Sequence, residues 1–263
     1  MRKAAIRKLL PWLPPLLLLA VWAGVCGAGL APDWLLPPPW RVLETLTVYL
    51  GLSAVADSGW SGWSGCFWPD AAASLGRVAC GYALAVVPAI PLGLLAGRCA
   101  WVERLLSVSV NGIRAVPGIS WLPLVILWCG IGFVATLALI ALAAFFPVYF
   151  SAAAGAASVP PTLTATGQML GLSRAAVFRR IVLPWAMPQL AAGLRVALGF
   201  SFAYLVLGEL TGVPDGLGAR IMEARMNGQA DLLLCGIVCI ACLGVACDRG
   251  LVLLLRRLPG MVR

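Results

Sequence analysis

Two charged side chains in otherwise apolar stretches, Arg195 and Glu209, are the first candidates for chemistry. An ionised group is costly inside a membrane and usually faces a cavity or a partner. Arg195 could therefore offer positive charge to an anion along a pathway, or it could reach the inner interface or pair with a backbone carbonyl group. Glu209 could serve as a gate or as an exposed helix cap. These alternatives stay open, and both residues are candidate pathway residues.

Several catalytic chemistries are excluded by what the sequence lacks. It contains no His, which removes His-based triads, HExxH zinc sites and His proton relays. A phosphate-binding GxxxxGK[ST] loop is also absent, since the only lysines are Lys3 and Lys8, so we expect no ATP hydrolysis by this chain. Cys235, Cys239 and Cys242 share a predicted helix face, but no His accompanies them. We therefore expect no catalytic residue, no metal site and no cofactor.

The composition places these residues in a membrane protein. Of the 263 residues, 62% are hydrophobic and 11% are charged, whereas a soluble globular domain carries about 25% charged residues. A crossing takes about 20 apolar residues, and its backbone groups must be satisfied internally, so each long apolar run should be a helix. The sequence therefore predicts an all-α, polytopic membrane protein with about six transmembrane helices, at residues 10–30, 75–97, 113–131, 133–151, 186–210 and 232–255.

Basic residues indicate the orientation of these helices, because short cytoplasmic loops are enriched in Lys and Arg. An N-terminus on the inside puts most basic residues, including Arg98, Arg104 and Arg114, on the cytoplasmic side. Both termini are then expected in the cytoplasm, with Arg77 at the outer interface. The net charge of +9 follows from this topology, so it does not call for a nucleic-acid partner.

This orientation divides the chain into four regions. Residues 1–31 form a cytoplasmic tip and the first helix, which we interpret as a retained anchor because its apolar stretch is longer than a usual signal-peptide core. Residues 32–73 form a periplasmic connection that includes a short helix at 42–50. Residues 74–257 form the membrane core, including a cytoplasmic loop at 160–184. Residues 258–263 form a cytoplasmic tail.

The loop at 160–184 is too long for a simple turn. Its pattern predicts one short helix at 162–170, a reversal at Gly171 and a second short helix that Ser173 caps and that ends near Leu183. The second helix is amphipathic. It could lie on anionic lipid, or it could insert into a groove of a soluble partner. Its apolar face consists of Val177, Phe178, Ile181 and Val182, and its basic side of Arg174, Arg179 and Arg180.

The spacing between Gly171 and the sequence Ile181-Val182-Leu183-Pro184 resembles the EAA motif, E-A-A-x3-G-x9-I-x-L-P, of binding-protein-dependent ABC importer permeases. The resemblance extends over residues 33–257. It is closest to the branch that handles nitrate, taurine, alkanesulfonates, bicarbonate and some thiamine precursors. Where the motif has Glu-Ala-Ala, this chain has Ala165-Thr166-Gly167, so the role of the acidic residue is not carried over. Further matching stretches lie at residues 74–98, 115–133, 143–150 and 183–199.

This resemblance implies a type I ABC importer permease in a bacterial inner membrane, in contact with membrane lipid. Its partners would be a cytoplasmic ATP-binding subunit, a periplasmic substrate-binding protein and a second permease subunit, expected to be an identical copy. The solute would be a small anion such as a sulfonate, taurine or nitrate. The loop would be a coupling helix pair that docks on the ATP-binding subunit, with ATPase-coupling residues Gly171, Leu172, Ser173, Arg174, Phe178, Ile181, Leu183 and Pro184.

An ion-coupled secondary transporter that works without an ATPase is the main alternative. That class often carries acidic residues at mid-membrane, and the predicted spans contain few of them. It would also leave the loop at 160–184 without a role. An intramembrane enzyme is a weaker alternative, because the sequence offers no His and no visible pair of facing carboxylates.

Overall fold

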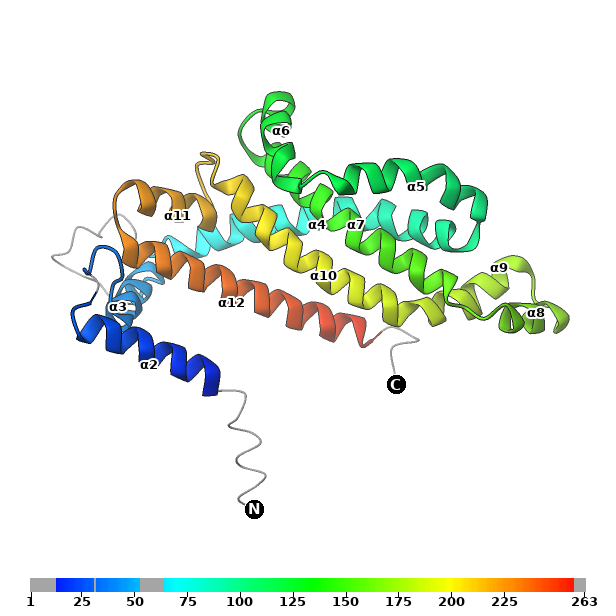
Figure 1. The fold of residues 1–263 in the computed structure, drawn as a ribbon, viewed down its shortest axis with the longest axis horizontal. Helices are drawn as coiled ribbons and strands as arrows, with labels where there is room; N and C mark the ends of the chain where they lie inside the picture. The colour runs from blue at the N-terminus through cyan, green and yellow to red at the C-terminus, as the bar shows by residue number, and fades with distance from the viewer. Residues whose placement is uncertain (1–12, 31, 53–63, 258–263) are drawn as a thin grey trace, which may run out of the picture. The chain divides into compact units, whose positions relative to one another are not determined.

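The computed structural model describes residues 13–30, 32–52 and 64–257, and each regular element in these ranges is a helix (Figure 1). The prediction of an all-α protein is therefore confirmed. The chain divides into two compact units, which are described one at a time. One comprises residues 1–71 and 220–239, and the other comprises residues 72–219 and 240–263.

Four stretches of the described chain are long and apolar enough to cross a membrane. They match the spans predicted at 75–97, 133–151, 186–210 and 232–255. The run predicted at 10–30 contains a shorter apolar helix of 15 residues, α2 (Leu13–Gly27). The four long stretches are α4 (Phe67–Arg98), α7 (Phe133–Ala157), the continuous helical stretch Arg174–Glu209 that ends in α10 (Leu183–Glu209), and α12 (Ala230–Leu255).

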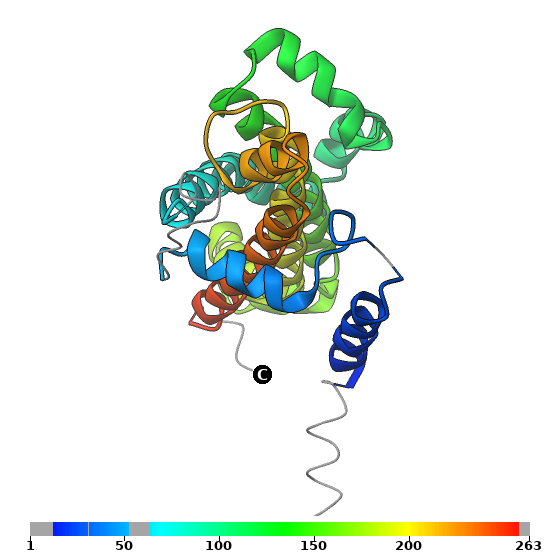
Figure 2. The ribbon, with the colours of Figure 1, turned by 90° about the vertical axis from the view of Figure 1, so that its left-hand side faces the viewer.

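The prediction of one unbroken helix at 113–131 is wrong. This region is the end of α5 (Ala100–Ala115), a 3-10 turn η3 (Gly118–Trp121) and α6 (Leu122–Cys129), and the two arms meet at 89° (Figure 1; from the side in Figure 2). Pro117 explains the break, because a residue before proline is pushed out of the helical region, and Val116 is extended with ψ 122°. Within the described residues, counting the bent pair as one span gives up to five candidates.

The first unit combines N-terminal helices with a later part of the chain. It holds α2, α3 (Pro39–Tyr49), most of α11 (Leu217–Met226) and the first turns of α12. Helix α3 confirms the short helix predicted at 42–50, with a proline in its first turn, where a missing N–H costs nothing. The predicted periplasmic connection also includes residues 53–63, which lie outside the described residues.

A buried carboxylate, Asp70, organises this first unit. It accepts a hydrogen bond from the Tyr49 hydroxyl at 2.9 Å and from Arg220 Nε at 2.8 Å. Tyr49 is 1% exposed, and its burial, followed by the charge of Asp70, raises the pKa of the phenol above its usual range. Tyr49 therefore stays a hydrogen-bond donor, and together with Arg220 it compensates a carboxylate that would be costly to bury alone.

The second unit is built around α7 and α10, which run side by side (Figure 1, green and yellow). Small residues bring the backbones of its helices together, as in many membrane helix pairs. On α4, a side chain at Gly93 or Gly97 would overlap the backbone carbonyl groups of Tyr149 and Ala153 on α7. The centre of this core is rich in fully buried alanines, namely Ala89, Ala144, Ala152, Ala156, Ala186 and Ala197.

The loop at residues 160–184 forms a compact elbow. It consists of α8 (Pro161–Met169), a turn, α9 (Arg174–Val177) and a π-helical turn η4 (Phe178–Val182) that leads into α10. The expectation that the second helix ends near Leu183 is wrong. The wide π turn lets the Leu183 N–H bond to the Phe178 carbonyl group, and Pro184 then occupies the first turn of α10, where its ring is tolerated.

Candidate functional site

The elbow between α8 and α9 depends on one glycine. Gly171 has a φ of +82°, and no atom lies within 4 Å of the position that a Cβ would take. The glycine is therefore needed for its backbone conformation and not for space. Just beyond it, Ser173 Oγ accepts a hydrogen bond from the Ala176 N–H at 3.3 Å, which confirms the predicted helix cap.

Helix α8 packs directly on the segment that follows the elbow. A Cβ at Gly167 would lie 2.7 Å from Ile181 Cδ1 and 3.4 Å from Val177 Cγ2. Gly167 occupies the position of the second alanine of the EAA motif. Because glycine is smaller than alanine, α8 can approach the Ile181 side chain more closely. The two arms of the elbow thus support each other as one body.

The apolar face predicted for a partner's groove is largely covered by the chain itself. Val177 and Val182 are buried, and Phe178, Ile181 and Leu183 pack against the core of the second unit. The large apolar side chains that remain open at the tip are Met169, 87% exposed, and Leu170, 79% exposed. Sequence reasoning missed these two, although a pair of large apolar residues immediately before a turn glycine is a usable signal. Arg174, Arg179 and Arg180 are exposed beside the tip.

Arg195 is paired within the second unit. Its Nε and Nη2 atoms each lie 2.8 Å from one carboxylate oxygen of Asp248 on α12. This two-pronged geometry is the strongest that Arg and a carboxylate form. The partner of Arg195 is thus a carboxylate and not a carbonyl group, and this ion pair ties α10 to α12.

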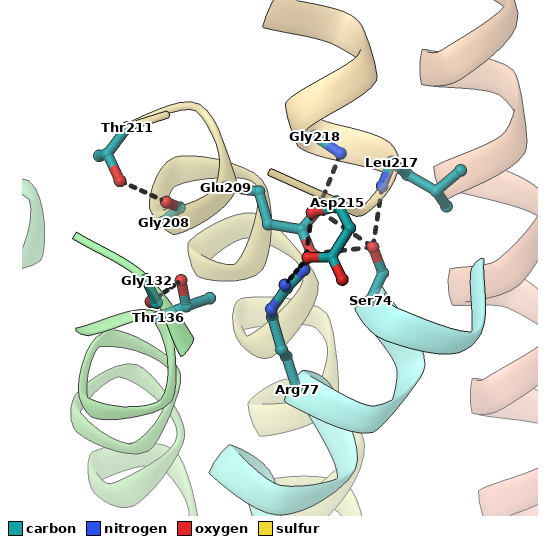
Figure 3. Close-up of polar contacts among 10 residues, drawn as sticks. All are labelled: Ser74, Arg77, Gly132, Thr136, Gly208, Glu209, Thr211, Asp215, Leu217 and Gly218. Atoms are coloured by element: carbon teal, nitrogen blue, oxygen red, sulfur yellow. Dashed lines mark hydrogen bonds and ion pairs between the residues drawn. The ribbon is translucent and has the colours of Figure 1, made fainter. Parts of the chain in front are cut away.

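Glu209 lies at the centre of a buried polar cluster (Figure 3). Its Oε1 atom is 2.6 Å from Arg77 Nη1, the Ser74 hydroxyl donates to it at 2.9 Å, and the Gly218 N–H donates to Oε2 at 2.8 Å. Glu209 is 0% exposed, so the exposed-cap alternative is wrong. Arg77 is buried as well, at 4% exposed, so its charge is compensated within the protein.

The same cluster holds the turn after α10 against α4. Arg77 donates to the Asp215 backbone carbonyl group at 2.9 Å and also pairs with the Asp215 carboxylate. The Leu217 N–H donates to the Ser74 hydroxyl at 2.9 Å (Figure 3). Sequence reasoning missed these partners because Arg77 and Glu209 are 132 positions apart and no local pattern links them.

A cavity of about 480 Å³ lies in the second unit, beside the central turns of α7 and α10. Most of its lining is apolar, and Arg114 is its charged residue. Arg195 and Glu209 do not line it. Within the described ranges, no group of three or more His, Cys, Asp or Glu side chains is arranged to hold a metal ion.

The helices, the elbow and the cavity define the class as an all-α membrane transport subunit, and comparisons identify its family. The family described as "Binding-protein-dependent transport system inner membrane component" matches residues 89–259, and the chain belongs to this family. It is accordingly an ABC importer permease subunit, whose family works with ATP-binding and substrate-binding partners.

Two relatives are similar over most of the chain. The "Taurine transport system permease protein TauC" of Escherichia coli (strain K12) is 37% identical, over 92% of this chain and 85% of the relative. The "Putative aliphatic sulfonates transport permease protein SsuC" of Bacillus subtilis (strain 168) is 32% identical, over 98% of this chain and 90% of the relative.

A solved structure shows the same fold. The MetNI methionine ABC transporter, in inward-facing conformations, has a chain that aligns with a TM-score of 0.58 and 20% identity. The alignment covers 74% of this chain and 94% of that chain. The predicted type I importer architecture is thereby confirmed.

Proposed function

We propose that this permease imports a small anion, with a sulfonate such as taurine as the first candidate and nitrate as a further one. A periplasmic binding protein would deliver the solute, and ATP hydrolysis in a separate subunit would power transport. The observation that carries this proposal is the similarity, over more than nine tenths of the chain, to relatives named for taurine and aliphatic sulfonates. The lack of a phosphate-binding loop in this sequence supports an ATPase on another polypeptide.

The elbow is the proposed docking site for that ATPase. A closing pair of ATP-binding subunits must move membrane helices, which requires a stiff link. The exposed Met169 and Leu170 offer apolar side chains for a groove, and the helical stretch Arg174–Glu209 runs from the elbow into the membrane span without a break. The predicted coupling residues shape this link: Gly171, Leu172, Ser173, Arg174, Phe178, Ile181, Leu183 and Pro184.

The proposed setting is a bacterial inner membrane, with both termini in the cytoplasm and two identical permease subunits embedded in lipid. Arg195 and Glu209 were the candidate pathway residues. Arg195 forms an ion pair with Asp248, and Glu209 forms one with Arg77. Their pairing supports a role in positioning the helices beside the pathway.

Uptake by the complete importer tests this proposal. The permease, its ATP-binding subunit and its binding protein are reconstituted in liposomes, and uptake of radiolabelled taurine, ethanesulfonate and nitrate is followed with and without ATP. We expect ATP-dependent uptake of at least one of these anions. Uptake that persists without the ATP-binding subunit and follows an ion gradient would instead establish the secondary-transporter alternative. Uptake of none of the three would refute the anion assignment.

A further inference from the structure

The cavity beside α7 and α10 has the size of a small-molecule site. Its volume of about 480 Å³ lies within the range of about 300–1,000 Å³ that is usual for ligand pockets. The central turns of α7 and α10 form its base, and the end of α5 with η3 forms a wall. Apolar side chains such as Phe146, Val196 and Phe200 make up most of the lining.

Arg114 gives this cavity its positive charge. Its guanidinium carbon lies 4.6 Å from the centre of the Phe150 ring, so one face of the cation rests on an aromatic surface. In the part of the chain that the structure describes, no carboxylate lies within 4.0 Å of Arg114, whereas Arg77, Arg195 and Arg220 all have one. The N–H donors of Arg114 are therefore available to an anionic ligand.

Neutral polar groups complete the lining. Ser151 and Tyr204 also line the cavity, and the structure gives neither hydroxyl group a hydrogen-bond partner among the described residues. Pro147, in the interior of α7, has no N–H to give to the carbonyl group of Ala143, which also lines the cavity. The lining thus combines one cation, two hydroxyl-bearing residues and a helix turn interrupted by a proline with an otherwise apolar wall.

The break at Pro117 positions this cation. Arg114 lies in the last turn of α5, just before the chain turns by 89°. After the break, Gly118 lets the Tyr204 ring approach, because a Cβ at Gly118 would overlap the Tyr204 hydroxyl. The distribution of basic residues predicts a cytoplasmic-side position for Arg114, and the structure adds its contact with the Phe150 ring on α7.

We propose that this cavity is a solute site in the permease, in which Arg114 binds the acidic group of a small organic anion. The planar fork of Arg matches the paired oxygens of a sulfonate or carboxylate, and the apolar wall accommodates a short carbon chain. This proposal rests on the proposed anion import and deepens it by naming the residue that contacts the solute.

A binding measurement without the binding protein tests whether the permease itself binds the solute. The permease with its ATP-binding subunit, but without the binding protein, is placed in phosphatidylcholine nanodiscs, and binding of radiolabelled taurine and ethanesulfonate is measured. We expect saturable binding that weakens at least tenfold in Arg114→Gln and is partly retained in Arg114→Lys. Arg104→Gln is the matched control, because Arg104 is an exposed arginine on the same helix that does not line the cavity.

Three results would overturn the proposal. The first is equal binding by Arg114→Gln and Arg104→Gln. The second is equal competition by ethyl methyl sulfone, a neutral compound of similar size, which would show that charge does not select the ligand. The third is loss of taurine binding in phosphatidylglycerol nanodiscs, which would assign the cavity to an acidic lipid headgroup.

An uptake measurement distinguishes failure of the proposed solute site from failure of the proposed import function. If wild-type liposomes show ATP-dependent anion uptake and Arg114→Gln transports as fast as Arg104→Gln, the import function stands and the site is wrong. If Arg114→Gln loses uptake but keeps ATP hydrolysis stimulated by the loaded binding protein, the defect lies in handling the solute and supports the site.

Discussion

Charged residues in this permease fall into two groups according to their partners. Arg77 and Arg195 are each compensated by a carboxylate on another helix, whereas Arg114 faces a cavity with its donors free of carboxylates in the described chain. The sequence alone singled out Arg195 because it interrupts an apolar run. It could not distinguish a paired arginine from an available one, because the partners are set by helix packing and are distant in sequence.

The buried Glu209 carboxylate is expected to dominate the stability of its end of the bundle. Glu209→Gln would leave the buried Arg77 guanidinium with the half-exposed Asp215 as its remaining carboxylate partner, and removing one partner of a buried ion pair costs about 3–5 kcal/mol. We expect a marked fall in the melting temperature of the detergent-solubilised protein, measured by fluorescence or light scattering.

The exposed Glu44 offers a matched control for this change. Glu44→Gln removes the same charge without touching the cluster and should leave the melting temperature within about 1–2 °C, because isolated surface substitutions have small effects. Equal melting temperatures for the two variants would show that the Arg77–Glu209 pair does not stabilise the fold.

Gly171 allows backbone and charge effects at the elbow to be separated. Asn and Asp both tolerate a positive φ better than most residues, and they differ mainly in charge. We expect Gly171→Asp to insert in the membrane but to lose its ATP-binding subunit, while Gly171→Asn retains at least part of the docking. Copurification of the ATP-binding subunit is the measurement. Normal copurification and transport by Gly171→Asp would contradict the coupling role of the elbow.

Helix packing depends on small residues at defined contacts. Gly93 on α4 meets the carbonyl group of Tyr149 on α7, whereas Gly76 on the same helix has no atom within 4 Å of its Cβ position. Gly93→Leu should therefore force α4 and α7 apart and reduce the yield of folded protein, and Gly76→Leu should be tolerated. Fluorescence-detected size-exclusion chromatography gives the comparison. A monodisperse, wild-type-like Gly93→Leu protein would show that this close approach is not required.

Element boundaries were predictable where local chemistry sets them. The cap at Ser173, the reversal at Gly171 and the short helix α3 follow from signals within a few residues. The single helix predicted at 113–131 is wrong, because the prediction relied on the length of the apolar run and not on the local effect of Pro117. The continuation of helix through Pro184 was also missed, since a π turn is not signalled by hydrophobic pattern.

At the scale of the whole molecule, composition and long apolar runs were sufficient to predict an all-α membrane protein. The motif near Gly171, together with the other matching stretches, was sufficient to predict the importer family. The elbow geometry adds what the motif could not supply. Its apolar face packs on the permease itself, and the surface left for a partner is the tip formed by Met169 and Leu170. Force would then pass from this tip along one unbroken helical stretch into the membrane.

Crosslinking from that tip tests the central claim most directly. A photoreactive benzoylphenylalanine at position 169 replaces Met169, and the same residue at position 127 replaces Leu127, a similarly exposed residue on α6. With the complete importer in liposomes, the account predicts a crosslink to the ATP-binding subunit from position 169 and none from position 127. Absence of a crosslink from position 169, together with labelling of a cysteine there by an impermeant reagent on the substrate-binding-protein side, would contradict it.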